Sequence, residues 1–232
     1  NGTLKSDNNK IMIQNYCNLT LDNMTVEDTN AQYVVSNNCG NISINNTTIN
    51  AGSNANQFAF DVCGYAKYTA GVTVTVSGTS VINGKVEISK SAGNTEPMKL
   101  NITGGTFNGD LKVDASVGTE NAKSIISVSG GTFSDPSVLK YMATNATVDI
   151  KLLSNINIAK TELATGYILN AANATANLNL NGHDIINSAE TADATPFTQI
   201  FTVQNGTLNI SGNGNVKCDA SATAKDDGYR MV

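Results

Sequence analysis

The chain has 232 residues and a formal net charge of −5, with 14 % charged residues, one His, one Arg, three Pro and no Trp. Its few cations are scattered, so no basic patch offers itself to a phosphate backbone, and no apolar run approaches the roughly 18 residues that a membrane helix needs. We therefore expect neither nucleic-acid binding nor membrane insertion. The 33 Asn residues take much of the polar role, and the length suits one domain spanning residues 1–232.

One pattern recurs along the chain: alternating apolar and polar residues, two small or polar residues, and a further apolar residue a few positions on. It reads LTLDNMTV from Leu19, ISINNTTI from Ile42, VTVSGTSV from Val74, LNITGGTF from Leu100, ISVSGGTF from Ile126, LNLNGHDI from Leu178 and LNISGNGNV from Leu208. A weaker eighth copy begins at Val148, in VDIKLL. Strict alternation predicts strands with one buried face, and Asn or Gly after each strand supplies the backbone for a corner.

The spacing between the starts of successive copies is typical of the coils of a parallel β-solenoid. A sandwich or barrel remains the alternative, although those folds favour hairpin turns at much shorter intervals and without a long repeat. We therefore predict an all-β parallel β-helix of about eight coils. The first apolar residue of each copy, from Leu19 to Leu208, should form one inward column, and the residue two places on, from Leu21 to Ile210, should form a second. Between them, small polar residues from Thr20 to Asn209 should form an outward column.

A different pattern follows the fifth copy. Asp135 and Pro136 supply a helix cap and a favourable first helical residue, and apolar residues follow at helical spacing. We predict one short lateral helix near 136–143 and a possible out-of-phase junction near 134–150.

These motifs resemble those of a known family. The two Gly-Gly-Thr-Phe copies at 104–107 and 130–133, with the Leu-Asn-Leu-Asn-Gly-His run at 178–183, are similar to right-handed parallel β-helix surface proteins of bacteria in the pectate-lyase-like superfamily. The resemblance implies a right-handed helix, the non-enzymatic branch of the superfamily, and an extracellular or cell-surface location. In such proteins the Gly-His coil usually opens the helix, whereas here it follows the Gly-Gly-Thr-Phe coils.

The reversed order suggests end-to-end contact. Read circularly, the last residues continue into the first as another coil, and neither end carries an amphipathic cap. We expect self-association through residues at the two ends, in a tandem protein or between subunits: Asn1, Gly2, Thr3, Leu4, Tyr229, Arg230, Met231 and Val232.

Four cysteines lie about one coil apart when the chain is read circularly: Cys17, Cys39, Cys63 and Cys218. They predict either a column of buried thiols or disulfides between adjacent coils, with the pairing open. No Cys-x-x-Cys pair supports a zinc site.

The sequence assigns no catalytic residue, metal or cofactor. His183 is followed by Asp184, but the paired Asp residues and the Arg-x-Lys of the pectin-cleaving relatives are missing, and a corner role is expected. Acidic residues form only the neighbours Glu27 and Asp28, Asp226 and Asp227, and the pair Asp110 and Asp114. Of the one aromatic gathering, Phe58 and Phe60 should be core, whereas Tyr65 and Tyr68 should lie on a protruding loop.

We therefore expect a non-enzymatic structural or adhesive module that assembles into a fibre or a long surface protein. A host or surface glycan or protein is a possible partner. The alternative is a carbohydrate-binding or polysaccharide-cleaving β-helix, which would require carboxylates from different coils to converge.

Overall fold

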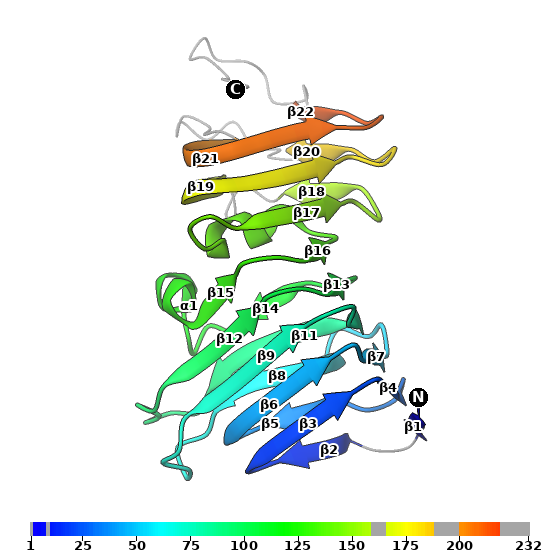
Figure 1. Ribbon diagram of the computed structural model, residues 1–232, viewed down its shortest axis with the longest axis vertical. Helices are drawn as coiled ribbons and strands as arrows, with labels where there is room; N and C mark the ends of the chain where they lie inside the picture. Colours follow the sequence, from blue (N-terminus) through cyan, green and yellow to red (C-terminus); the bar gives the residue numbers. More distant parts are fainter. Residues whose placement is uncertain (1, 8–9, 159–165, 188–199, 219–232) are drawn as a thin grey trace. The chain divides into compact units, whose positions relative to one another are not determined.

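The computed structural model describes residues 2–7, 10–158, 166–187 and 200–218 (Figure 1). The chain divides into two compact units, with the boundary between Ser134 and Asp135. Each unit consists mainly of parallel strands. The all-β parallel β-helix predicted from the repeats is confirmed, whereas the single-domain organisation stays a prediction.

The first unit contains three parallel sheets that the chain visits in turn. Sheet A contains β1 (Gly2–Ser6), β4 (Met24–Asp28), β7 (Thr48–Ala51), β10 (Val81–Asn83), β13 (Thr106–Phe107) and β16 (Thr132–Phe133). Sheet B contains β2 (Ile11–Asn15), β5 (Tyr33–Asn37), β8 (Phe58–Gly64), β11 (Lys85–Lys90) and β14 (Leu111–Val113). Sheet C contains β3 (Asn18–Asp22), β6 (Gly40–Asn45), β9 (Val72–Ser77), β12 (Met98–Ile102) and β15 (Ile126–Val128). In Figure 1 sheet C lies in front of sheet B, and the chain rises as a right-handed coil.

Sheet C holds the first five copies of the repeat, stacked in register. Leu19 pairs with Ile42, and the column continues through Val74, Leu100 and Ile126. Ile42, Val74 and Leu100 are at most 2 % exposed, so the predicted inward column is the core of this unit. The outward column from Thr20 through Ser43, Thr75 and Asn101 to Ser127 is also confirmed.

The corner between sheets C and A explains the Asn or Gly of each copy. Asn23 and Asn46 have φ of 52° and 46°, and Gly78 has φ of 63° at the third corner. Gly adopts this left-handed conformation freely, and Asn adopts it more readily than most other residues. After this corner, an inward column of sheet A contains Val26, Ile49, Ile82 and Phe107, and these four are fully buried. In the third copy the core residue is thus Ile82, one place after the Val81 that ends the sequence pattern.

Two short helices accompany the strands in the described part of the chain. The lateral helix expected near 136–143 is confirmed as a 3₁₀ helix, η1 (Pro136–Tyr141), in which the Asp135 carboxylate accepts a hydrogen bond from the Ser137 amide at 2.6 Å. It packs against β19 of the same unit. The second helix, α1 (Thr119–Ile125), was not predicted from the sequence; it lies between β14 and β15 and buries Ala122.

The described residues of the second unit form two parallel sheets. One consists of β17 (Thr147–Lys151), β19 (Tyr167–Asn179) and β21 (Phe201–Ser211). The other consists of β18 (Ile156–Ile158), β20 (Ile185–Asn187) and β22 (Val216–Cys218).

In the second unit the predicted columns are wrong by two residues. Leu178 pairs with Ile150 and Ile210, whereas Val148 and Leu208 pair with Ala176. Likewise Asn209 pairs with Asn177 and not with Asn179. Because apolar and polar residues alternate along each strand, a shift of the pairing register by two residues keeps the same face buried. The alternation therefore cannot distinguish the two registers. Ile210, expected in the core, is 45 % exposed because β21 is the last strand of its sheet among the described residues.

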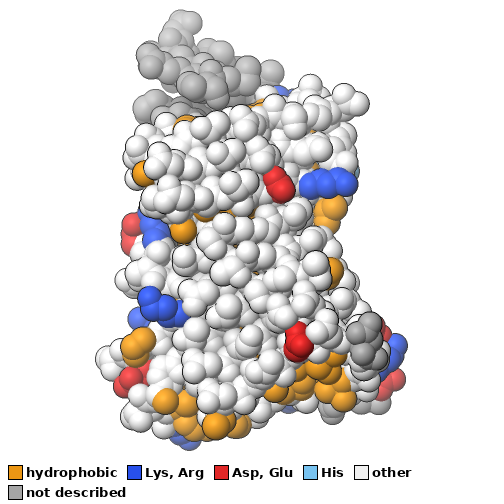
Figure 2. Space-filling view, viewed as in Figure 1, with side chains coloured by type: hydrophobic (Ala, Val, Ile, Leu, Met, Phe, Trp, Pro, Cys, Tyr) orange, Lys and Arg blue, Asp and Glu red, His pale blue; other side chains and the backbone are white. Residues whose placement is uncertain are grey.

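Polar side chains form hydrogen-bonded ladders across the strands. On sheet A, Lys5 pairs with Glu27 at 2.5 Å, and amide groups continue the ladder from Glu27 to Asn50 (3.0 Å), Asn83 (2.8 Å) and Asn108 (2.7 Å). Asp149, Asn177 and Asn209 form a similar ladder in the second unit. Figure 2 shows that the face over sheet C is mostly uncharged polar surface. The abundant Asn therefore serves both corners and ladders.

Burial along the sheet A column predicts where truncation is costly. Replacing the fully buried Ile49 by Ala should lower the free energy of unfolding by about 2 to 5 kcal/mol, because it leaves a cavity between two coils. The matched change Leu4→Ala, at the 44 % exposed end of the same column, should cost about 1 kcal/mol or less. Urea denaturation followed by circular dichroism measures both. Equal losses would contradict the stacking order.

Candidate functional site

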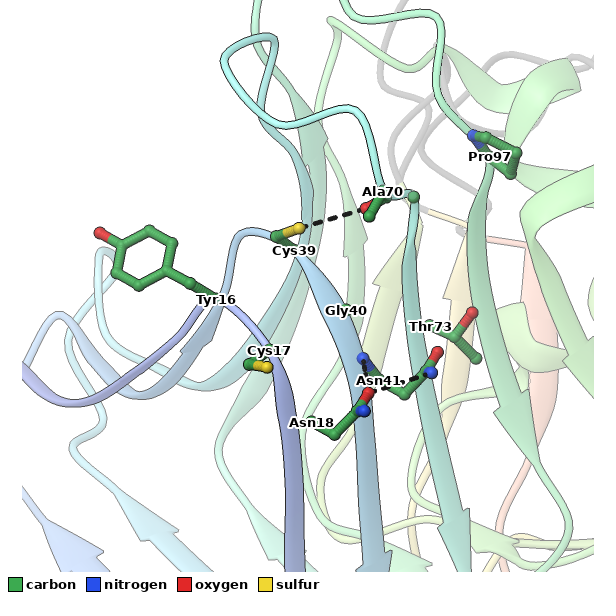
Figure 3. Close-up of a pocket in the computed structure, with 10 residues that line it drawn as sticks. Tyr16, Cys17, Asn18, Cys39, Gly40, Asn41, Ala70, Thr73 and Pro97 are labelled. Atoms are coloured by element: carbon green, nitrogen blue, oxygen red, sulfur yellow. Dashed lines mark hydrogen bonds between the residues drawn. The ribbon is translucent and has the colours of Figure 1, made fainter.

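A groove of about 460 Å³ lies at the corner where sheet B passes into sheet C (Figure 3). Its lining comes from four successive coils: Tyr16, Cys17 and Asn18; Cys39, Gly40 and Asn41; Ala70, Gly71 and Thr73; and Pro97. No lining residue carries a formal charge. The volume lies within the range of small-molecule sites, and the groove crosses the coils one after another.

Two glycines allow the coils to approach closely at this corner. A Cβ on Gly40, whose φ is +81°, would lie 1.9 Å from the Cys17 carbonyl oxygen, and a Cβ on Gly71 would lie 2.4 Å from the Pro97 carbonyl oxygen. The Gly40 amide instead donates to the Gly71 carbonyl at 3.0 Å. A side chain at either position would therefore force the coils apart.

Three tyrosine rings cluster beside the groove. Tyr68 lies 5.1 Å from Tyr16 and 5.7 Å from Tyr65, measured between ring centroids. Tyr16 is 45 % exposed and Tyr65 is 36 % exposed. Desolvation, followed by the neighbouring Tyr16, raises the pKa of Tyr68. Tyr65 and Tyr68 lie on a loop between β8 and β9, as expected, but Tyr16 was missed because it lies two coils away in the sequence.

The cysteines lie in different surroundings. Cys17 is exposed in the groove, Cys39 is buried there and its thiol donates to the Ala70 carbonyl at 3.3 Å, and Cys63 is half-buried on β8. These three are free thiols. Burial raises the pKa of Cys63 to about 11. The side chain of Cys218 lies outside the described part of the chain, and the predicted disulfide or thiol column stays a prediction.

A pair of carboxylates on sheet B was not predicted from the sequence. Asp61 of β8 and Glu87 of β11 are in register on adjacent strands, one coil apart. The Tyr33 hydroxyl donates to Glu87 at 2.6 Å, and Tyr33 stacks on Phe58 at 5.3 Å. Asp61 accepts hydrogen bonds from the Asn37 amide at 2.5 Å and from the Ser36 hydroxyl at 3.2 Å.

Asp61 is only 3 % exposed, which governs its chemistry. Burial, with a smaller contribution from Glu87, raises the pKa of Asp61 to about 7. The hydrogen bonds from Asn37 and Ser36 oppose this shift without cancelling it. A carboxyl group with so little exposed surface is poorly placed to meet a polysaccharide.

The residues expected at the end-to-end interface are partly described. Gly2, Thr3 and Leu4 lie in β1, the edge strand of sheet A, and all three are exposed. Asn1 and the other predicted members, Tyr229, Arg230, Met231 and Val232, lie outside the described residues.

His183 lies at a corner, as expected, where its amide donates to the Leu180 carbonyl at 2.8 Å. The neighbouring Asp184 pairs with Lys217 at 2.7 Å and accepts hydrogen bonds from Asn215 at 2.9 Å, and these contacts lower the pKa of Asp184. This aspartate therefore links two coils.

Within the described ranges, no group of three or more His, Cys, Asp and Glu side chains could hold a metal ion. The helices described by the structure are also too short or too polar to cross a membrane.

Comparison with family models, curated proteins and solved structures gave no match. The resemblance to bacterial β-helix surface proteins therefore stays a prediction that rests on the sequence motifs.

The buried Asp61 predicts an unusual dependence of stability on pH. Its pKa is higher in the folded chain than the ordinary value of 3.8, so the folded chain binds the proton more tightly than the unfolded chain. This contribution to stability is present below about pH 4 and is lost as the pH rises to about 7. Asp61→Asn should therefore gain stability over the original chain through that window, by up to about 4 kcal/mol.

Urea denaturation of both proteins at several pH values measures this difference. Ser36→Ala is a control, because it removes one hydrogen bond and leaves the titrating carboxyl group. A constant difference between the original chain and Asp61→Asn from pH 4 to pH 8 would show that Asp61 does not titrate as its burial requires.

Proposed function

We propose that the chain is a non-enzymatic structural and adhesive module whose coils join end to end, in a fibre or a long surface protein outside the cell. The exposed first coil carries this proposal. β1, β2 and β3 are the edge strands of sheets A, B and C, so each has a paired strand on one side only among the described residues. Such edges favour pairing with a further strand.

Side chains of this first coil support the same conclusion. Leu4 occupies the inward column of Val26, Ile49, Ile82 and Phe107, which are all fully buried, yet Leu4 itself is 44 % exposed. Ile11, Ile13 and Leu19 are half-buried in the other two sheets. Hydrophobic side chains gather at this lower end of the first unit in Figure 2. A further parallel coil would cover them and extend the existing columns.

Strand β21, the last described strand of its sheet in the second unit, is also suited to such contact. Val203 and Ile210 of β21 are 48 % and 45 % exposed on this strand. Parallel strands in both units allow a head-to-tail joint, in which the β1 edge of one copy pairs with the β21 edge of another. Repetition of this heterologous contact produces a fibre.

The burial of Asp61 favours a structural role over polysaccharide cleavage. A glycosidase needs two carboxyl groups flanking the substrate. Asp61 and Glu87 lie in register on adjacent strands of sheet B, and Asp61 is almost entirely buried. The residues that line the groove carry no carboxyl group.

The proposal predicts that a charge at the first coil blocks assembly. Light scattering of the purified chain should show a mass that rises with concentration, and electron microscopy should show rods. Leu4→Glu should keep the chain monomeric, because a carboxylate would be buried without a partner in the joint. Leu153→Glu provides the matched control, since Leu153 is similarly exposed (52 %) and belongs to neither β1 nor β21.

Leu153→Glu should assemble like the original chain. A monomer at all concentrations for the original chain, or equal assembly by Leu4→Glu, would refute a joint through this edge.

A further inference from the structure

The groove beside the tyrosine cluster has the composition of a site for an uncharged, hydroxyl-rich ligand. Asn18, Asn41 and Thr73 provide amide and hydroxyl groups, whereas Tyr16 and Pro97 provide apolar surface. Since no lining side chain is charged, a phosphate or sulfate group would find no ion pair in the groove. A neutral ligand with both polar and apolar faces fits this lining.

The exposed tyrosines indicate how the apolar face of such a ligand would bind. Tyr16 and Tyr65 are held close to Tyr68 by ring contacts of 5.1 and 5.7 Å, so the rings are positioned before any ligand arrives. In Figure 3 the Tyr16 ring lies at one end of the groove and points away from the other labelled lining residues. Aromatic rings that combine a flat apolar face with a hydroxyl group at the edge suit the C–H faces and hydroxyl groups of a sugar.

The spacing of the polar groups indicates a chain-like ligand. Asn18, Asn41 and Thr73 are in register on β3, β6 and β9, so each coil supplies one polar group. Successive groups are about 4.8 Å apart, which is close to the length of one pyranose unit. Asn18 already orders its neighbour, because its side-chain oxygen accepts from the Asn41 amide nitrogens at 3.4 and 3.2 Å.

The wall next to the groove continues the same chemistry. The outward column of sheet C consists of Thr20, Ser43, Thr75, Asn101 and Ser127, and all five are uncharged. In Figure 2 this face is mostly uncharged polar surface. A ligand that extends from the groove toward this column meets further hydroxyl and amide groups, whereas one that continues past Thr73 along the helix axis meets the exposed Lys99 of β12.

We propose that this groove binds a neutral polysaccharide chain lying along the helix axis, with a sugar ring against Tyr16 and Tyr68 and hydroxyl groups on Asn18, Asn41 and Thr73. The binding needs no chemical step. It names the class of ligand for the proposed adhesive function and rests on that function only for its biological role. Binding itself does not require assembly, since one copy of the chain contains the whole site.

Intrinsic fluorescence offers a direct test, because the chain has seven Tyr and no Trp. The purified chain is titrated with cello-hexaose, chito-hexaose and manno-hexaose as neutral probes and with polygalacturonate oligomers as the acidic probe. At least one neutral hexaose should change the tyrosine emission saturably, and isothermal calorimetry should give the same affinity. Tyr16→Ala should weaken binding about tenfold through the lost stacking. Leu153→Ala should leave binding unchanged, since Leu153 is similarly exposed but lies far along the sequence in the second unit.

Other results would overturn the proposal. Binding of polygalacturonate alone, binding by Tyr16→Ala at full affinity, or no response to any neutral hexaose would each exclude a neutral glycan in this groove. Asn41→Ala gives a second variant should Tyr16→Ala fail to fold, with the same expected loss. The assay is run on Leu4→Glu as well as on the original chain, so that failure of glycan binding and failure of end-to-end assembly are observed separately.

Discussion

The structure depends on parallel strands stacking in register from one coil to the next. Each coil places an aliphatic residue over its equivalent in the coil below, as Leu19, Ile42, Val74 and Leu100 do in sheet C. The same register aligns the outward amides, so Glu27, Asn50, Asn83 and Asn108 hydrogen-bond in sequence. The same strand register therefore pairs the outward polar groups in hydrogen bonds and packs the inward side chains into the core. It also leaves the first coil with exposed apolar side chains, because nothing described lies beneath it.

In-register stacking explains which features could be predicted from the sequence. Alternation at Leu19 to Leu21 or Ile42 to Ile44 specifies which side chains face inward, and Asn23 or Gly78 marks the corner, so the sheet C columns could be predicted correctly. Alternation does not specify the partner strand. In the segments 177–181 (NLNLN) and 207–211 (TLNIS), a shift of two residues exchanges one apolar position for another. The alternation therefore does not reveal that Leu208 pairs with Ala176. In the third copy the quoted motif ends at Val81, but the buried residue is its neighbour Ile82.

The candidate sites were harder to predict because they are made by stacking. Asp61 and Glu87 are one coil apart along the chain and look like isolated surface acids until the strand register places them side by side. Tyr16 joins Tyr65 and Tyr68 in the same way, across two coils. The spacing of one coil was the available signal, but the coils differ too much in length for that spacing to identify pairs. Helix α1 is short and has no side-chain cap, and its sequence carries little that distinguishes it from a loop.

The most direct test of the account is amide hydrogen exchange of β1 as a function of protein concentration. Strand β6 lies between β3 and β9, so its amides should be protected at every concentration. Strand β1 pairs only with β4 among the described residues, and its amides should exchange rapidly in dilute solution and become protected as copies join. Protection of β1 that is as strong as that of β6 in dilute solution, or that never rises with concentration, would contradict an edge that serves as the joint.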